Sequence, residues 1–205
     1  MFKNRTVFLV DDDAAVCHAL SMFLETSGFS VRTFPSAEAF LEYADVTMDG
    51  VMLLDQRMTG MTGLELQAEL AKRGIVLPII FITGHGDVQM SVKAIKGGAL
   101  DFLEKPFSNQ ELLNSVREAF SLADASRKQR NQMTALRNSF DSLTTRECEV
   151  LEHVIAGQSN RHMADLLGVS DRTIEVHRSR VMKKMGADSL PDLVRKYAML
   201  KKVGK

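Results

Sequence analysis

Four positions in the first half of the chain combine side chains that could transfer a phosphoryl group. Asp11–Asp13 directly follow one short apolar run, Asp55 follows another, and Thr83 and Lys105 follow two more. Carboxylates brought together repel one another unless a divalent cation or a shifted pKa relieves them. Oxygen ligands without Cys or His favour a hard ion, most plausibly Mg²⁺ (or Mn²⁺). In such a set Asp55 could attack a phosphorus atom while the metal and Lys105 neutralise charge and Thr83 donates to the product.

These residues need a scaffold that brings strand ends together. Short runs rich in Val, Ile, Leu and Phe, too short for helices, predict five buried strands at Thr6–Val10, Phe29–Phe34, Val51–Leu54, Leu77–Ile82 and Asp101–Leu103. Amphipathic helical patterns separate them, which predicts an α/β domain with a doubly wound, five-stranded parallel sheet and helices on both faces. Ligands of such sheets bind at the carboxyl ends of the strands. The candidate residues are therefore expected at one edge.

Each candidate also has an ordinary structural explanation. Asp13 before two alanines fits a helix N-cap better than a ligand. Lys105 alone would be read as a surface lysine, and Thr83 alone is uninformative. The phosphoryl-transfer hypothesis rests on the combination, because all four strand ends carry a suitable group in a consistent order.

The chain changes character after about residue 120. Residues 1–120 hold 10 Lys and Arg against 16 Asp and Glu, and residues 121–205 hold 16 against 10, so an acidic half precedes a basic one. This asymmetry suggests one part that binds cations and another that binds polyanions. A polar stretch without Gly or Pro lies between them. We therefore predict a domain at 1–121, a helical linker at 122–141 and an all-α four-helix domain at 142–205.

The basic half has the spacing of a helix-turn-helix. A helical pattern ends at Leu167-Gly168, Ser170 can cap the next helix, and a longer helical pattern follows. On that helix Ile174 and His177 share the inward face, so His177 is expected to be a half-buried packing residue. The opposite face is polar and basic, as a helix in the major groove requires, although a merely solvated face would look similar.

Composition limits the cellular compartment in which the protein is expected. No apolar stretch approaches the roughly 18 residues that span a bilayer, and the opening residues lack a signal-peptide pattern. The two cysteines, Cys17 and Cys148, lie in helical patterns and suit a reducing compartment. We expect a cytoplasmic protein that makes no membrane contact.

The acidic site resembles the receiver domain of two-component response regulators. The segments Asp55–Gly63, Thr83–Asp87 and Asp101–Phe107 are similar to the FixJ subgroup of that family. The resemblance implies that Asp55 is the phosphoacceptor and that a partner histidine kinase supplies the phosphoryl group. It implies Mg²⁺ held by the side chains of Asp12 and Asp55 and the backbone carbonyl of Arg57, with Asp11 contributing through water.

The same resemblance implies a conformational switch. Thr83 and Phe102 would form the switch pair, Lys105 would contact the phosphoryl oxygens, and the Lys105–Pro106 peptide bond would be cis. Without the resemblance Phe102 is a core aromatic. The family usually has proline where this chain has Thr59, and we expect threonine to loosen that loop slightly.

The basic half is similar to the LuxR/NarL-type DNA-binding domain, through Ser142–Glu147, Ile155–Gly157 and Thr173–His177. That resemblance places the second helix of the motif in the major groove of double-stranded DNA. The base contacts it implies are Glu175, Val176 and Ser179. The phosphate contacts it implies are Asn160, Thr173, Arg178 and Lys183. It also implies a homodimer formed on phosphorylation, contact with RNA polymerase, and regulation, most plausibly activation, of transcription.

Two other function classes fit parts of the pattern. An aspartate-nucleophile phosphatase would use Asp11 as nucleophile and Asp13 as acid/base, but Ala14-Ala15 stands where a small hydroxyl residue is wanted and the chain leaves no room for a cap domain. An adaptor could instead use the basic domain to bind an acidic protein or RNA. The resemblance favours a regulator that is not an enzyme.

Overall fold

The computed structural model describes residues 5–84 and 88–203, which divide into two compact units, Met1–Ser126 and Arg127–Lys205. In the first unit, strands and helices alternate along the chain: β1 Thr6–Val10, α1 Ala14–Thr26, β2 Ser30–Phe34, α2 Ala37–Tyr43, β3 Val51–Asp55, α3 Gly63–Lys72, β4 Ile79–Thr83, α4 Val88–Lys96 and β5 Asp101–Glu104. The long helix α5, Asn109–Asp141, begins in this unit and continues into the second.

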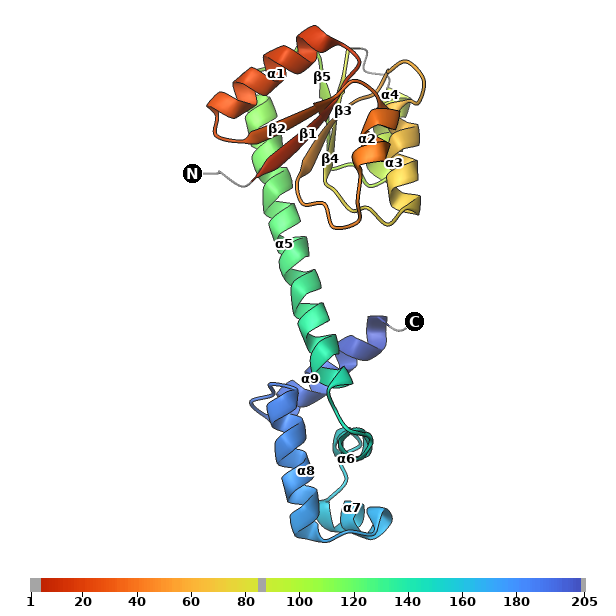
Figure 1. Cartoon of the computed structure of the whole chain (residues 1–205), viewed down its shortest axis with the longest axis vertical. Coiled ribbons are helices and arrows are strands. Elements are labelled where there is room, and N and C mark those ends of the chain that lie inside the picture. Colours follow the sequence, from red (N-terminus) through yellow and green to blue (C-terminus); the bar gives the residue numbers. More distant parts are fainter. Residues whose placement is uncertain (1–4, 85–87, 204–205) are drawn as a thin grey trace. The chain divides into compact units, whose positions relative to one another are not determined.

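The sheet has strand order β2-β1-β3-β4-β5, and every neighbouring pair is parallel (Figure 1). The chain therefore starts near the middle of the sheet, builds outward to one side, and then crosses to the other. All five expected strands are present, and only β4 is displaced by two residues from its expected start. The α/β prediction is confirmed.

Side chains of each central strand alternate between two cores. Phe8 and Val10 of β1 pack with residues of α2, α3 and α4, whereas Val7 and Leu9 pack with residues of α1 and α5. Strands β3 and β4 are buried along their whole length. A strand covered on both faces reads as a continuous apolar run, which is why these strands were visible in the sequence.

The second unit is helical in its described part. It contains the last turns of α5, followed by α6 Thr145–Ile155, α7 Asn160–Leu167, α8 Asp171–Lys184 and α9 Leu190–Val203. Its core joins Val150, Met163, Ile174 and Val181, and Phe140 of α5 packs against it. Within the described residues, no helix is both long enough and apolar enough to span a bilayer.

Side-chain caps set the helix starts. Thr62 and Thr144 each accept from a backbone N–H three residues on, while Glu65 and Glu147 bond back, which completes two capping boxes. Ser170 caps α8, and Gly168 ends α7 in the left-handed region with φ 64°. These polar spacings produce the short turn between α7 and α8.

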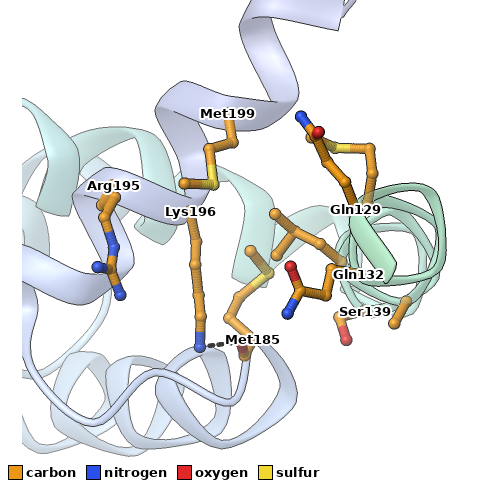
Figure 2. A pocket seen from close by; sticks show the side chains of 10 residues that line it. Gln129, Gln132, Ser139, Met185, Arg195, Lys196 and Met199 are labelled. Carbon is orange, nitrogen blue, oxygen red and sulfur yellow. Dashed lines mark hydrogen bonds between the residues drawn. The ribbon is translucent and has the colours of Figure 1, made fainter. Parts of the chain in front are cut away.

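The second unit also contains a cavity of about 860 Å³ between the last turns of α5, the end of α8, and α9 (Figure 2). Met185 and Met199 contribute apolar surface, and Gln132 and Lys196 line it too. The Lys196 ammonium is 3.1 Å from Asp192, so its charge is compensated within α9. The cavity is therefore mainly an apolar recess.

Candidate functional site

The carboxyl edge of the sheet brings two carboxylates and one ammonium together. Lys105 Nζ lies 3.1 Å from Asp11 Oδ2 and 3.3 Å from Asp55 Oδ1. Asp11 and Asp55 are only 3% and 7% exposed, because Asp11 directly follows β1 and Asp55 ends β3, both inner strands of the sheet. The backbone N–H of Lys105 donates to Thr83 O at 2.7 Å, which ties the lysine to the end of β4. The Lys105–Pro106 bond is cis, as the resemblance implies.

The cluster of Asp11, Asp55 and Lys105 has two acidic groups and only one basic group. Burial raises the pKa of the Asp55 carboxyl, and the neighbouring Asp11 charge raises it further, against the opposing effects of the Arg57 N–H and Lys105. Burial alone would lower the pKa of Lys105, but the charges and hydrogen bonds of Asp11 and Asp55 outweigh it and raise that pKa. A metal cation bound at this edge would relieve the remaining repulsion between the Asp11 and Asp55 carboxylates.

Asp12 is held differently from its neighbours. Its Oδ2 accepts from the backbone N–H of Thr59 at 2.8 Å and from the Thr59 hydroxyl at 2.9 Å. Those bonds lower the pKa of Asp12. Within residues 5–84 and 88–203, no group of three His, Cys, Asp or Glu side chains is arranged to hold a metal. Asp11 and Asp55 converge on Lys105, whereas Asp12 is engaged with Thr59, so the expected convergence of all three carboxylates stays a prediction for the metal-bound site.

The remaining aspartate of the run caps a helix. Asp13 Oδ1 accepts from the N–H groups of Ala15 and Val16, at 2.8 and 3.2 Å. The N-cap interpretation of Asp13 is confirmed. Because an acid/base carboxyl must be available to substrate, this engagement disfavours the phosphatase reading, in which Asp13 would carry the proton.

The donor set nevertheless suits a hard cation. Asp11, Asp12 and Asp55 offer carboxylate oxygens at one edge, and the loop after β3 adds backbone carbonyls beginning with Gln56 and Arg57. The Arg57 N–H donates to Asp55 Oδ2 at 2.7 Å, so the loop wraps closely around the end of β3. All of these are oxygen donors, which Mg²⁺ prefers.

The loop from residue 57 to 62 is anchored on both sides. The Met61 N–H donates to Glu38 Oε1 at 3.0 Å. Gly63, where α3 begins, approaches the backbone so closely that a Cβ there would lie 2.4 Å from Asp55 O. Thr59 supplies two donors that proline lacks and bonds to Asp12, which opposes the looser loop expected from threonine at this position.

The expected switch residues occupy neighbouring strands. Thr83 ends β4 and is 1% exposed, and Phe102 of β5 is half-buried with its ring 6.3 Å from Phe81. Phe81 and Phe102 are register partners across the β4–β5 pair. The residues His85–Asp87 that contributed to the resemblance lie outside the described residues. Phe102 thus stands at the border between core and surface.

In the second unit, α8 has one apolar face and one exposed face. Ile174, Val181 and Met185 are buried and His177 is half-buried, as the spacing predicts. The exposed face carries Arg172, Glu175, Val176, Ser179, Arg180 and Lys183. The expected base contacts and Lys183 are thus available to a partner, while Thr173 is half-buried and its hydroxyl lies 2.8 Å from that of Ser170.

Two of the expected phosphate contacts bond to each other. Arg178 Nη1 of α8 donates to Asn160 Oδ1 of α7, and both side chains are half-buried. Sequence reasoning missed this pair, because both residues are ordinary surface types that meet only when the two helices cross. It also missed the ion pair of Lys184 with buried Glu147, at 2.6 Å, although the capping box already marked Glu147.

Comparison with protein families decides what this pair of units is. Residues 7–117 match the response regulator receiver domain, and residues 141–197 match the bacterial regulatory proteins of the luxR family. The chain belongs to the response regulators. Their LuxR-type members are transcription regulators rather than enzymes, so the enzyme alternative falls with the family assignment.

Full-length relatives of this response regulator share both parts. The response regulator protein TmoT of Ectopseudomonas mendocina is 45% identical over 97% of this chain and 90% of its own. The transcriptional regulatory protein FixJ of Rhizobium meliloti is 43% identical over 94% of both chains. The solved structure of the response regulator StyR is 42% identical over 95% of this chain and 98% of its own, with a TM-score of 0.86. The FixJ-type prediction is confirmed.

Proposed function

We propose that this response regulator accepts a phosphoryl group on Asp55 from a cognate histidine kinase and, once phosphorylated, dimerises, binds DNA and activates transcription. One observation carries the proposal. Lys105 bridges Asp11 and Asp55 at the carboxyl edge of the sheet, beside the buried hydroxyl residue Thr83. This set holds a nucleophilic carboxylate next to a fixed cation.

The transfer itself is a simple substitution. An Asp55 oxygen attacks the phosphorus of a phosphohistidine, the phosphorus–nitrogen bond breaks, the imidazole takes up a proton, and a mixed anhydride forms on Asp55. Asp55 is positioned for this by the Arg57 N–H, which holds Oδ2 and leaves Oδ1 beside Lys105. The lysine then balances charge on the transferred oxygens.

Mg²⁺ (or Mn²⁺) is the cofactor that this site would hold, through the side chains of Asp12 and Asp55, the Arg57 carbonyl and, through water, Asp11. When bound, the ion supplies positive charge to the transferring phosphoryl oxygens. The chain's own contribution is a buried, pre-positioned nucleophile whose pKa is raised by burial and, to a smaller extent, by the neighbouring Asp11 charge.

The signal is proposed to leave the site through Thr83, Lys105 and Phe102. Thr83 would donate its hydroxyl to the phosphoryl group, and Phe102, now half-buried against the core, would turn inward. The face made by α4, β5 and α5 would then change shape and pair with a second copy.

DNA recognition is proposed for residues 142–205 of the second unit, with 122–141 as the helical connection from the receiver domain at 1–121. The exposed face of α8 would enter the major groove, where Glu175, Val176 and Ser179 meet base edges. Asn160, Thr173, Arg178 and Lys183 would hold phosphates. A dimer would present two such helices to a two-fold operator and bring RNA polymerase to it.

Intact-mass measurement tests the phosphoacceptor. The wild-type chain treated with acetyl phosphate and Mg²⁺ should gain one phosphoryl mass, which hydroxylamine removes. Asp55→Asn should gain none, and omission of the metal should abolish the gain in wild type. Asp13→Asn, which alters only the helix cap, should still be labelled. Full labelling of Asp55→Asn would reject the assignment.

Footprinting tests the output. Genomic fragments should show protected sites with dyad symmetry, and acetyl phosphate should lower the protein concentration needed for protection in wild type but not in Asp55→Asn. Binding that discriminates no DNA sequence from another, or equal affinity for RNA, would favour the adaptor reading instead.

A further inference from the structure

Thr59 holds the carboxylate of Asp12 with two donors at once. The backbone N–H lies 2.8 Å from Asp12 Oδ2, and the hydroxyl of the same residue lies 2.9 Å from the same oxygen. A carboxylate oxygen has two lone-pair sites, so Thr59 occupies both sites of Oδ2. Asp12 is therefore committed to the loop after β3.

That commitment separates Asp12 from the Asp11–Asp55 pair. Lys105 gathers Asp11 and Asp55, but the three carboxylates together make no metal-holding group in the described part of the chain. Both Asp12 and Thr59 are exposed, whereas Asp11 and Asp55 are buried. Asp12, which is proposed to hold the cation, is thus hydrogen-bonded to Thr59 and not grouped with Asp11 and Asp55.

The loop cannot easily follow Asp12 toward those partners. Glu38 accepts from the Met61 N–H at 3.0 Å on one side of Thr59. Gly63, on the same side, lies against the Asp55 backbone, and on the other side of Thr59 the Arg57 N–H donates to Asp55. Because these anchors fix the donors in place, Asp12 must give up its bonds to Thr59 before its Oδ2 can bind a cation.

We propose that Thr59 is a positioning residue that latches Asp12 and thereby weakens Mg²⁺ binding at the phosphoacceptor site. The inference rests on the proposed function, since it takes Asp12 as a Mg²⁺ ligand. The latch competes with the cation for the same carboxylate. Thr59 alone supplies both hydrogen bonds of the latch, one from its side chain and one from its backbone. Substitutions can therefore remove one bond or both.

Substitutions can remove the donors separately. Thr59→Val keeps the shape and the N–H but removes the hydroxyl, Thr59→Pro removes both donors, and Thr59→Ser keeps both. Thr62→Val is a matched control, because the Thr62 hydroxyl lies in the same loop but bonds to Glu65. Thermal unfolding in EDTA identifies any variant that fails to fold.

Calorimetric titration of the metal-free full chain with MgCl₂ measures the effect. An exposed hydrogen bond to a charged group contributes modestly, so Thr59→Val should bind Mg²⁺ about three-fold more tightly and Thr59→Pro about ten-fold more tightly. Thr59→Ser and Thr62→Val should match wild type. In ¹⁵N-labelled wild type, the Thr59 amide signal should shift upfield with the same Mg²⁺ midpoint, as its bond to Asp12 breaks.

Two results would overturn the latch. The first is a Thr59→Val or Thr59→Pro affinity equal to or weaker than wild type, which would mean that Thr59 is neutral or helps to hold Asp12 for the cation. The second is a Thr59 amide signal that stays in place while Mg²⁺ saturates the site. Failure of wild type to bind Mg²⁺ at all would instead remove the proposed metal site, and the latch with it.

Discussion

Arg178 of α8 and Asn160 of α7 hold each other by a hydrogen bond from the guanidinium to the amide oxygen. The bond fixes the first turn of α7 against the middle of α8, where the two helices of the motif cross. Both residues are proposed to hold DNA phosphates. Their contributions to binding should therefore be coupled rather than independent.

Asn160→Ala should weaken binding to operator and scrambled duplexes alike, by about three- to ten-fold, because it frees the Arg178 side chain and removes one phosphate contact. Since no charge is lost, the salt dependence should stay unchanged. Arg178→Ala should reduce the salt slope by about one unit. Titrations of both single variants and the double variant give the coupling; strictly additive losses would show that the bond has no role in DNA binding.

Two residues on the exposed face of α8 should behave differently from each other. Lys183→Ala should weaken all duplexes about equally and lower the salt slope by about one unit. Val176 is 44% exposed and uncharged, so it can meet a thymine methyl. Val176→Ala should cost the specific site about 1 kcal/mol and barely affect scrambled DNA. The opposite pattern, measured at three salt concentrations, would mean that α8 is oriented the other way in the groove.

The ion pair between buried Glu147 and half-buried Lys184 should make the second unit acid-sensitive. The hydrogen bond from Lys184, helped by the Thr144 N–H, lowers the pKa of Glu147 to about 2. A carboxyl whose folded pKa is depressed contributes stability that is complete above its unfolded pKa of about 4.5 and is lost as pH falls toward 2. Lys184→Met should therefore destabilise the unit by about 2 kcal/mol at pH 7.

Tyrosine emission allows the loss of stability in Lys184→Met to be assigned to the second unit. The chain has no Trp and two Tyr, so a Tyr43→Phe background leaves Tyr197, in the second unit, as the one tyrosine. Urea unfolding of that background, with and without Lys184→Met, should show the 2 kcal/mol difference at pH 7 and a smaller one near pH 3. A difference that does not change with pH would mean that the pair contributes through packing alone.

Lys105→Met should affect stability and metal binding in opposite ways. Without Mg²⁺, removal of the ammonium leaves Asp11 and Asp55 as two buried carboxylates, which should destabilise the first unit by about 1–2 kcal/mol at pH 7. The pKa of Asp55 is already raised, so acidification should protonate it and shrink the loss. Urea unfolding in a Tyr197→Phe background reads this from Tyr43.

The Mg²⁺ affinity of Lys105→Met should be unchanged or tighter, because the lysine and the ion neutralise the same charges. Calorimetry measures it directly. DNA binding stimulated by acetyl phosphate should be lost in the same variant. A severe loss of Mg²⁺ affinity would contradict the division of labour between Lys105, which carries the signal, and the carboxylates, which hold the ion.

The sequence predicted those features that depend on local pattern. Continuous apolar runs located the buried strands, and the spacing of Thr144 with Glu147 located the start of a helix. Because parallel strands end at one edge, the meeting of Asp55 with Lys105 could also be predicted. The strands, the helix start and the meeting of Asp55 with Lys105 all follow from periodicity or topology. None of them depends on a side-chain rotamer.

Features that depend on side-chain direction could not be predicted. Asp11 and Asp12 are adjacent in the chain, yet one points to Lys105 and the other bonds to Thr59. The side chains of consecutive residues at a strand end point in different directions. The partner of Asp12 lies in a loop 47 residues further along the chain, so it could not be read from the local pattern. The Asn160–Arg178 bond is of the same kind, since it forms only where two helices cross.

Helix α5 contributes to two cores along its length. Phe120 stacks on Phe29 in the first unit, whereas Met133, Leu136 and Phe140 pack against the core of the second, and residues 125–132 between them are all exposed. Proteases that cut after Lys or Arg can therefore reach this stretch without opening either core. A fragment beginning at residue 142 would lack three apolar side chains of its own core, so DNA-binding fragments should start near residue 127.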